Sequence, residues 1–177
     1  SLEGFIEKLK SGDNAVTVAI TGLGSPGGLA SVVLSKGFGK QVKTVTYDSS
    51  SDCALAVVTG ECDATFAPVT VVTGQIEAGT LKTIAVTTAE ESDSLPGVPS
   101  IAQNYSECAD MNLRSVCFLG ALGDTDPEIV QWLSDTLNEA VASQSYADLT
   151  APMMMTPKVW DMDGMSQYCK EAYEYYV

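Results

Sequence analysis

Short apolar runs alternate with helix-like segments over the first half of the chain. Residues 15–20, 40–48, 62–69 and 81–88 have the length and β-branched composition of strands. Residues 2–10 place Leu2, Phe5, Ile6 and Leu9 on one helical face, and further helices are predicted after each of the first three strands. This alternation predicts an α/β fold, with a mainly parallel sheet and right-handed crossovers.

Local signals mark where these helices begin and end. The helix over 27–39 is predicted to point Leu29, Val32 and Val33 inward and to stop at Gly37. The helix over 49–60 has N-cap candidates in the serines at 49–51 and a stop at Gly60. A further helix over 69–79 ends at Gly79.

The pattern changes after residue 95. A Pro-Gly turn (95–100), a short helix (101–107) and a strand (111–122) come first, and helices over 125–143, 144–151 and 162–177 follow. The helix at 125–143 has Asp126 as a cap candidate and Pro127 in its first turn. These last helices have no sheet of their own, so they need another surface to pack on.

Charge and composition exclude several classes of function. Nine Lys and Arg residues stand against 23 Asp and Glu, for a net charge of −14. So few cations cannot form a basic face for nucleic acid or for an anionic membrane. Arg114 is the single arginine, so a multi-arginine clamp on phosphate or carboxylate is excluded. No apolar run reaches the roughly 18 residues that a membrane span needs.

The chain contains no histidine, which removes Ser-His and Cys-His catalysis and histidine-ligated metal sites. We therefore expect no catalytic residues, no metal and no cofactor. Cys53, Cys62 and Cys117 lie in apolar runs, which favours small buried side chains, although one disulfide among the five cysteines stays open.

Residues 20–30, ITGLGSPGGLA, place the spacing Gly22-x-Gly24-x-x-Gly27 between a strand and a helix. Such a loop presents free N–H groups and the positive end of a helix dipole to an anion. Asp48, at the end of the next strand, stands where a dinucleotide fold grips the ribose. Pro26, in contrast, removes one N–H donor. The pattern alone leaves three alternatives: a nucleotide, another anion or a plain turn.

The order of motifs along the whole chain resembles one family, the receptors of tripartite tricarboxylate transporters, also called TctC or Bug proteins. GLGSPGGLA (22–30) is similar to the family's G-x-G-S-x-x-H-L-A. The later matches, in order, are TYDSSSDCA (46–54), VVTGECDATF (57–66), IEAGTLKTIAVT (76–87), LPGVPSIAQ (95–103) and the helix from Pro127 to Ala140. The chain departs from the pattern with Gly28 in place of a histidine, Asp48 in place of a lysine and Ser49 in place of a glycine.

This resemblance implies a periplasmic-binding-protein fold, in which two α/β lobes close on a small organic acid. Residues 1–122 would form the second lobe, and the helical segment 123–177 would pack on the first lobe, most of which this chain would lack. The implied function is that of an extracytoplasmic receptor, not an enzyme. It would pass a di- or tricarboxylate, or an acidic amino acid, to membrane permease subunits. A periplasmic location follows, with a lipid anchor left open, and the surface without its lobe could self-associate.

The resemblance also implies the ligand contacts. The glycine loop would hold the carboxylate through Gly22, Leu23, Gly24, Ser25 and Gly27, with the Ser25 hydroxyl and the loop N–H groups as donors. The neighbouring strand ends would add Tyr47, Ser49, Asp63 and Phe66. Each has a structural alternative: the glycines as turn formers, Tyr47 as packing and Asp63 as a strand-start or turn residue. The rival function is an NAD(P)-binding enzyme domain that uses Gly22, Gly24, Gly27 and Asp48.

Overall fold

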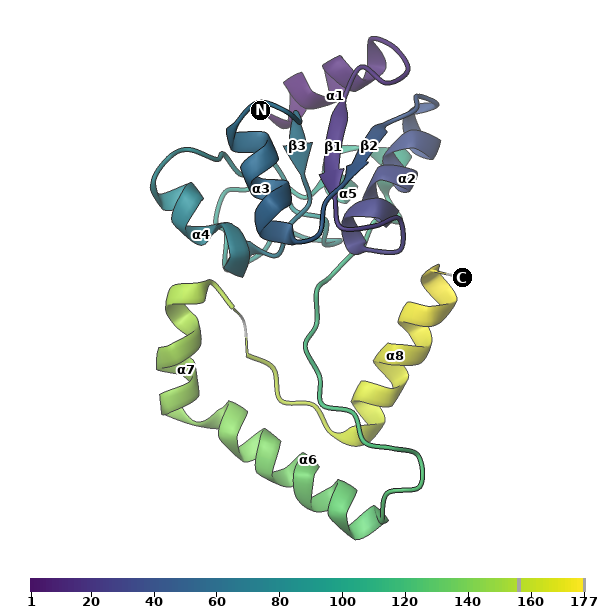
Figure 1. The fold of residues 1–177 in the computed structure, drawn as a ribbon. Coiled ribbons are helices and arrows are strands. Elements are labelled where there is room, and N and C mark those ends of the chain that lie inside the picture. Colours follow the sequence, from purple (N-terminus) through teal and green to yellow (C-terminus); the bar gives the residue numbers. More distant parts are fainter. Residues whose placement is uncertain (156, 177) are drawn as a thin grey trace. The chain divides into compact units, whose positions relative to one another are not determined.

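The computed structural model describes residues 1–155 and 157–176, with the backbone alone for residues 175 and 176. Val177, the last residue of the predicted C-terminal helix, lies outside this range. The chain divides into two units, Ser1–Ser115 and Val116–Val177 (Figure 1). The predicted boundary, after residue 122, falls seven residues later than this division (122 against 115).

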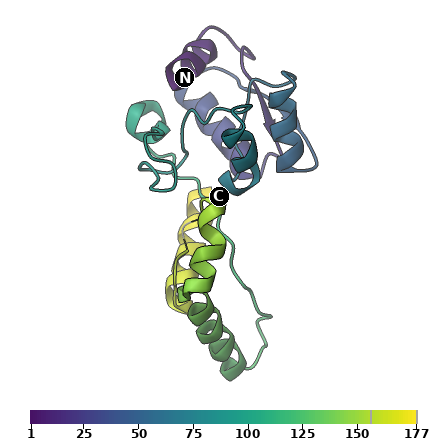
Figure 2. The ribbon, with the colours of Figure 1, turned by 90° about the vertical axis from the view of Figure 1, so that its left-hand side faces the viewer.

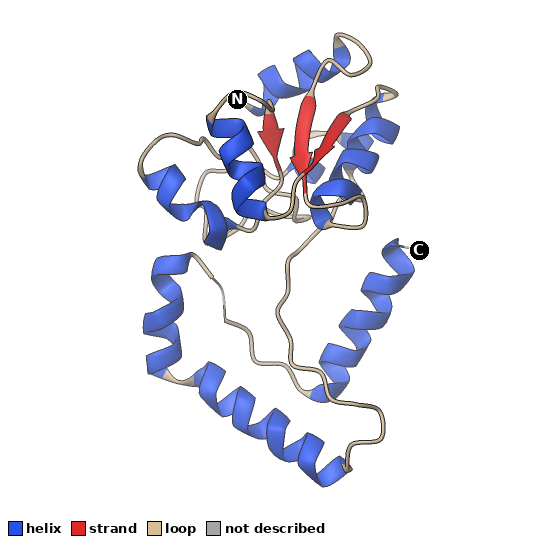
Figure 3. Ribbon diagram, viewed as in Figure 1, coloured by secondary structure: helices blue, strands red, loops and turns tan. Residues whose placement is uncertain are grey.

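The first unit is built on a small parallel sheet in the order β2-β1-β3. Strand β1 (Thr17–Ile20) lies in the centre, with β2 (Lys43–Thr46) and β3 (Ala64–Thr65) parallel to it on either side. Val18, Ala19 and Ile20 are fully buried. This accords with the apolar, β-branched composition that predicted the strand, and it confirms an α/β fold around a parallel sheet (Figure 3).

Helices cover both faces of this sheet. Helix α1 (Leu2–Lys10) buries Leu2, Ile6 and Leu9, as its periodicity predicted, and lies on the same side as α2 (Pro26–Phe38) (Figure 2). Helix α3 (Ser50–Val58) covers the opposite face. Right-handed crossovers require this arrangement, because the connection from β1 to β2 runs in the opposite direction to that from β2 to β3. The later helices of this unit are α4 (Val69–Glu77) and α5 (Ile101–Asn104), and the short 3₁₀ turn η1 (Ser106–Cys108) follows α5.

The predicted caps are confirmed, but the predicted inner face of α2 is wrong at Val32, while Leu29 and Val33 are half-buried. Ser49 caps α3, and Gly60 and Gly79 have positive φ angles directly after the C-caps of α3 and α4. Helix α2 continues past Gly37 to a left-handed Gly39, and Val32 on its outer side is 41% exposed. The buried positions of α2 are mostly small: Gly27, Gly28, Ala30, Ser31 and Leu34. Small side chains let the helix axis lie closer to the sheet than its bulkier valines would.

Two predicted strands do not form. Residues 81–88 make only an isolated parallel bridge, Val86 to Ser100, and residues 111–122 are in no strand. Near the bridge, Leu113 N–H donates to the Thr87 carbonyl at 2.8 Å, which keeps Met111 and Leu113 buried. Beyond residue 115 the segment is extended and exposed (Figure 1). It forms no strand, because a strand needs a neighbouring strand to accept its hydrogen bonds.

The second unit consists of helices with little buried interior. Helices α6 (Pro127–Ala142), α7 (Gln144–Thr150) and α8 (Met162–Tyr176) are joined by the 3₁₀ turn η2 (Ala151–Met153) and loops. Asp126 caps α6 and Pro127 lies in its first turn, as predicted. Among the described residues from 116 onward, Thr150 alone is fully buried.

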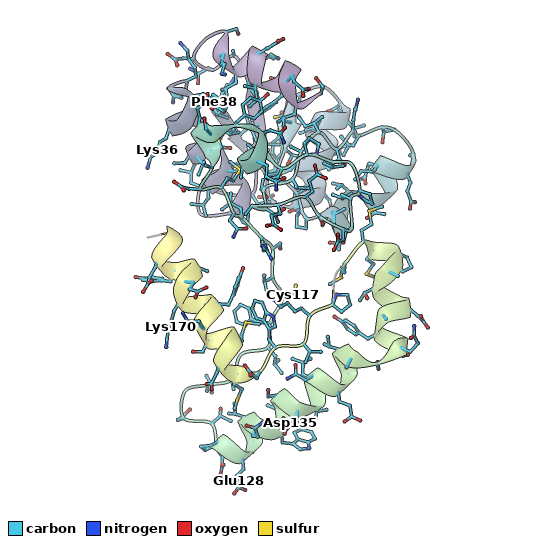
Figure 4. The ribbon with its side chains drawn as sticks, turned by 180° about the vertical axis from the view of Figure 1, so that it is seen from behind. Lys36, Phe38, Cys117, Glu128, Asp135 and Lys170 are labelled. Carbon is cyan, nitrogen blue, oxygen red and sulfur yellow. The ribbon has the colours of Figure 1, made fainter. Side chains whose placement is uncertain are left out.

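The large hydrophobic side chains of this unit are exposed instead. They include Phe118, Leu119, Leu122, Ile129, Trp132, Leu137, Leu149, Val159 and Tyr173. Cys117 is also exposed on the extended segment (Figure 4), so its predicted burial is wrong, whereas Cys53 and Cys62 are buried as predicted. All five cysteines are free thiols.

The close packing of α2 gives a direct test of the fold. A Cβ on Gly37 would lie 2.4 Å from the Glu107 carbonyl oxygen, whereas a Cβ on Gly74 in α4 would meet no atom within 4 Å. We expect Gly37→Ala to lower the free energy of unfolding by about 1–3 kcal/mol. Gly74→Ala is the matched control, which should raise it by about 0.5–1 kcal/mol through helix propensity. Urea denaturation measures both, and equal effects of the two variants would contradict this packing.

Candidate ligand-binding site

The carboxyl ends of the three strands meet at one edge of the sheet. Strand β1 ends at Ile20, whose carbonyl accepts a hydrogen bond from the N–H of Tyr47 at 2.9 Å. Ala19 pairs with Thr65, which brings Phe66 to the same edge on the other side of β1. The chain runs from β1 to β2 on one side of β1 and then returns to β3 on its other side, so the strand order reverses and a topological switch point lies between β1 and β3. In open α/β sheets, ligands bind at this position.

The glycine loop at this edge is held closed by its own hydrogen bonds. Gly22 has a φ of 148°, a conformation that L side chains rarely adopt. The Ser25 hydroxyl donates to the Gly22 carbonyl at 2.7 Å and accepts from the Gly28 N–H at 3.1 Å. The Ser25 N–H also donates to the Gly22 carbonyl, at 3.1 Å. Ser25 is thus the N-cap of α2, and Pro26 follows in the first turn.

These internal bonds decide which donors remain for a ligand. The predicted donors Ser25 Oγ and Gly28 N–H are already engaged within the loop. The backbone N–H groups of Leu23, Gly24 and Gly27 have no partner within the described part of the chain. The free end of a helix dipole lies beside them. The loop therefore offers a small set of backbone donors suited to one anionic group.

Gly28 is required by the shape of this loop. A Cβ at Gly28 would lie 2.3 Å from the Leu23 carbonyl oxygen and 2.5 Å from that of Gly22. Any side chain here would displace the loop from the helix. The family pattern has a histidine at this position. In this chain the loop folds back onto α2 and leaves room only for glycine.

Phe66 is the predicted contact that lies closest to the loop. A Cβ on Gly27 would be 3.3 Å from both Cβ and the carbonyl oxygen of Phe66, so the two backbones nearly touch. Helix α4 starts shortly after Phe66, with Pro68 at its N-cap and no side-chain cap. The sequence predicted this helix over 69–79, but its N-terminus was not counted among the groups at this edge, although the helix directly follows a predicted strand end.

Tyr47 and Ser49 follow β2 and have structural partners. The Tyr47 ring packs on the buried cluster of Ala19, Cys53, Ala56 and Cys62, and its hydroxyl lies 3.7 Å from Cys62 Sγ. Desolvation, with hydrogen bonds to Cys62 and Glu61, raises the pKa of the Tyr47 hydroxyl. Ser49 caps α3: it accepts from Asp52 N–H at 3.1 Å and donates to Asp52 Oδ2 at 2.7 Å.

Asp63 lies at the other end of the sheet. Its Oδ1 is 2.6 Å from Lys8 Nζ, and its Oδ2 accepts from the N–H of Thr17, the first residue of β1. Because residues that precede a parallel strand lie at its amino edge, Asp63 is not brought together with the glycine loop. Desolvation would raise the pKa of Asp63, but the bonds from Lys8 and Thr17 outweigh it, and the pKa is lowered.

An open hollow of about 520 Å³ lies beside β2 and α3, separate from the loop. It is lined by Thr46, Tyr47, Asp48, Asp52, Leu55, Ala56, Thr59 and Glu61. Three carboxylates and no cation make this hollow unsuited to an organic acid. It is also where Asp48 lies, next to β2 rather than at the switch point between β1 and β3.

The arrangement of strands does not match the dinucleotide alternative. A dinucleotide-binding half has strand order 3-2-1, in which the third strand pairs with the second. Here β3 pairs with β1. Within the described residues, no group of three or more Cys, Asp or Glu side chains could hold a metal ion.

An open parallel sheet, helices on both faces and a donor-lined loop at its switch point define the class of this unit as a periplasmic-binding-protein-like lobe. The comparisons identify the family. Residues 1–175 match the sequence model of the protein family described as "Tripartite tricarboxylate transporter family receptor". The chain belongs to this family, and the comparisons give no support to the dinucleotide-binding alternative.

Curated relatives are similar over most of the chain. Protein BugT of Bordetella pertussis is 26% identical over 160 residues, which cover 90% of this chain and 48% of BugT. A UPF0065 protein of Agrobacterium vitis is 27% identical over 154 residues, which cover 87% of this chain and 44% of the relative. The chain therefore spans about half the length of these relatives.

Solved structures share the fold. A structure of R. palustris Rpa4515 with adipate has a TM-score of 0.79 at 20% identity, covering 99% of this chain and 59% of that protein. The periplasmic binding protein BugD has a TM-score of 0.72 at 16% identity, covering 98% and 58%.

The two serine caps give a matched test of the loop. Ser25→Ala and Ser49→Ala should each lower the free energy of unfolding by about 1 kcal/mol, since each removes one N-cap. Only Ser25→Ala also releases the Gly22 carbonyl and leaves the Gly28 N–H without its acceptor, so it alone should speed amide hydrogen exchange at Gly28 and at residue 25. Denaturation and NMR-detected exchange measure the two effects. If Ser49→Ala accelerated the same amides, the Ser25 bond would not be what closes the loop.

The Lys8–Asp63 pair gives a pH test. Because the pKa of Asp63 is lowered in the folded state, its contribution is present above the ordinary aspartate value of 3.8 and is lost as pH falls through the folded value. Asp63→Asn should cost about 0.2–1 kcal/mol at pH 7, the range for exposed pairs. The difference from the unchanged chain should vanish in acid, as measured by denaturation from pH 7 to pH 2. A difference independent of pH, or a cost of Asp63→Asn at pH 7 that is equally large in a Lys8→Gln background, would contradict the pairing.

Proposed function

We propose that this chain forms the ligand-binding part of an extracytoplasmic receptor for a small carboxylate-bearing metabolite. The observation that carries the proposal is the glycine loop, whose unpartnered N–H groups lie at the sheet's switch point in a member of this receptor family. Gly22, Leu23, Gly24, Ser25 and Gly27 shape and hold this loop, with Phe66 against it. The receptor would deliver its ligand to the permease subunits of a tripartite tricarboxylate-type transporter.

Features of relatives support this function. One structural neighbour was solved with adipate, a dicarboxylate, and another is a periplasmic binding protein. A periplasmic location for this chain rests on that family relationship. Within the described residues, no helix is long and apolar enough to cross a membrane.

The second unit has a separate role in this proposal. Its helices would pack on the other lobe of a two-lobed receptor, which accounts for large side chains such as Trp132 at 64% exposure and Leu122 at 79%. Monomeric proteins rarely expose contiguous apolar patches of more than a few hundred Å². In the chain alone, this surface would instead favour self-association.

Binding and lobe closure, not catalysis, would be the function. A ligand that contacts both lobes shifts the population toward the closed state. With half the length of its relatives, the chain alone would make only part of these contacts, so it should bind weakly.

A charge placed in the loop tests the proposal. A Cβ at Gly24 would meet no atom within 4 Å, so a side chain is tolerated there. In an amide NMR titration of the 177-residue chain with adipate, the signals of Leu23, Gly24 and Gly27 should shift at millimolar concentrations. Gly24→Glu should abolish these shifts by repulsion, and the neutral control Gly24→Gln should retain most of them.

The same titration separates the alternatives. NAD should leave the loop signals unchanged. Shifts caused by NAD and not by adipate, or adipate binding that Gly24→Glu leaves intact, would contradict the proposed function.

A further inference from the structure

The two segments that meet at the proposed carboxylate site carry no charged side chains. Residues 15–35, from β1 through the loop into α2, contain no Asp, Glu, Lys or Arg, and residues 64–76, from β3 through most of α4, contain none either. Charges return at Lys36 and Glu77. A carboxylate here is balanced only by backbone N–H groups and helix N-termini, so a second carboxylate would find no cation in this unit's half of the site.

Polar side chains at this edge are few, and two of the four hydroxyls are engaged. The Ser25 hydroxyl closes the glycine loop, and the Thr65 hydroxyl donates to the Ala19 carbonyl at 3.0 Å. Thr21 and Thr70 are the remaining hydroxyls between residues 20–28 and 64–70, and both are exposed. In these segments, hydroxyl groups on a ligand would therefore find only the hydroxyls of Thr21 and Thr70 as side-chain partners.

Apolar side chains occupy the remaining positions. Leu23 exposes 68% of its surface. Two of the free donors, its own N–H and that of Gly24, flank its side chain along the backbone. Phe66, Ala67, Pro68 and Val69 are half-buried and continue this apolar character from β3 to the start of α4. A ligand held by the loop N–H groups would lay the atoms next to its carboxylate against Leu23 and this segment.

We propose that the site selects a carboxylate carried on an apolar body, such as an aliphatic chain, over hydroxylated or tricarboxylate acids. This inference rests on the proposed function and specifies its ligand class. Each methylene that Leu23 and the Phe66–Val69 segment cover should raise affinity about three- to fourfold. Each ligand hydroxyl buried without a partner should lower it about tenfold.

Two ligand comparisons in the full 177-residue chain test this selectivity, with the amide shift of Gly24 as the readout. Acetate, butyrate and hexanoate differ only in chain length, and affinity should rise along the series. Succinate and tartrate have the same carbon number and charge and differ by two hydroxyls, and succinate should bind more tightly. Citrate should bind no better than acetate.

A matched pair of variants locates the effect. Leu23→Ser should flatten the chain-length series, lowering the affinity for hexanoate by a larger factor than the affinity for acetate. Leu55→Ser is the control, because Leu55 is 58% exposed but lies on α3 beside the acidic hollow, and it should leave the series intact. Neither residue is buried, so both variants should fold.

The outcomes separate this inference from the proposed function. A flat series in the unchanged chain, or tartrate or citrate binding as tightly as succinate, would overturn the selectivity and leave carboxylate binding in place. Absence of a response to every carboxylate, acetate included, would overturn the proposed function itself.

Discussion

The close approach of helix α2 to the sheet and to its own preceding loop is the constraint on which the rest of the first unit depends. At Gly28 there is no space for even a Cβ beneath the Leu23 carbonyl, and at Gly27 the helix nearly touches the Phe66 backbone. This contact lets the loop fold over the helix N-terminus, where Ser25 closes it. It also brings β3 and the start of α4 to the loop. The ligand site is thus a consequence of packing between small residues rather than of reactive side chains.

Much of this fold could be predicted from the sequence, because its signals are local. The helix caps at Ser49 and Asp126 are side chains that bond to the first turn they precede. The left-handed residues after α3 and α4 are glycines. What failed depended on distant parts of the chain. The inner face of α2 was misassigned because hydrophobic periodicity favours valines, whereas this interface needs glycine and alanine. The segment 111–122 has strand composition, but composition does not provide a partner strand.

The site divides in the same way. The glycine loop and the proximity of Phe66 follow from strand ends that meet at one edge, so sequence order could suggest them. Asp63 precedes β3 instead of following it, as the strand-start alternative for this residue has it, and that position places it at the amino edge. The bonds that engage the Ser25 hydroxyl could not, since only the folded loop shows that this hydroxyl serves the helix and leaves the backbone N–H groups to the ligand.

The net charge of −14 sets a further condition on how such a site works. A protein this acidic repels an organic anion at long range, and the small number of cations is not gathered near the loop. Salt limits this repulsion to about 8 Å at physiological ionic strength. Because residues 15–35 and 64–76 are free of carboxylates, these two segments contribute only N–H groups and helix ends to the local field. Affinity must then come from short-range bonds and apolar contact, not from electrostatic attraction. This places the discrimination between acids in the part of the ligand beyond its carboxylate.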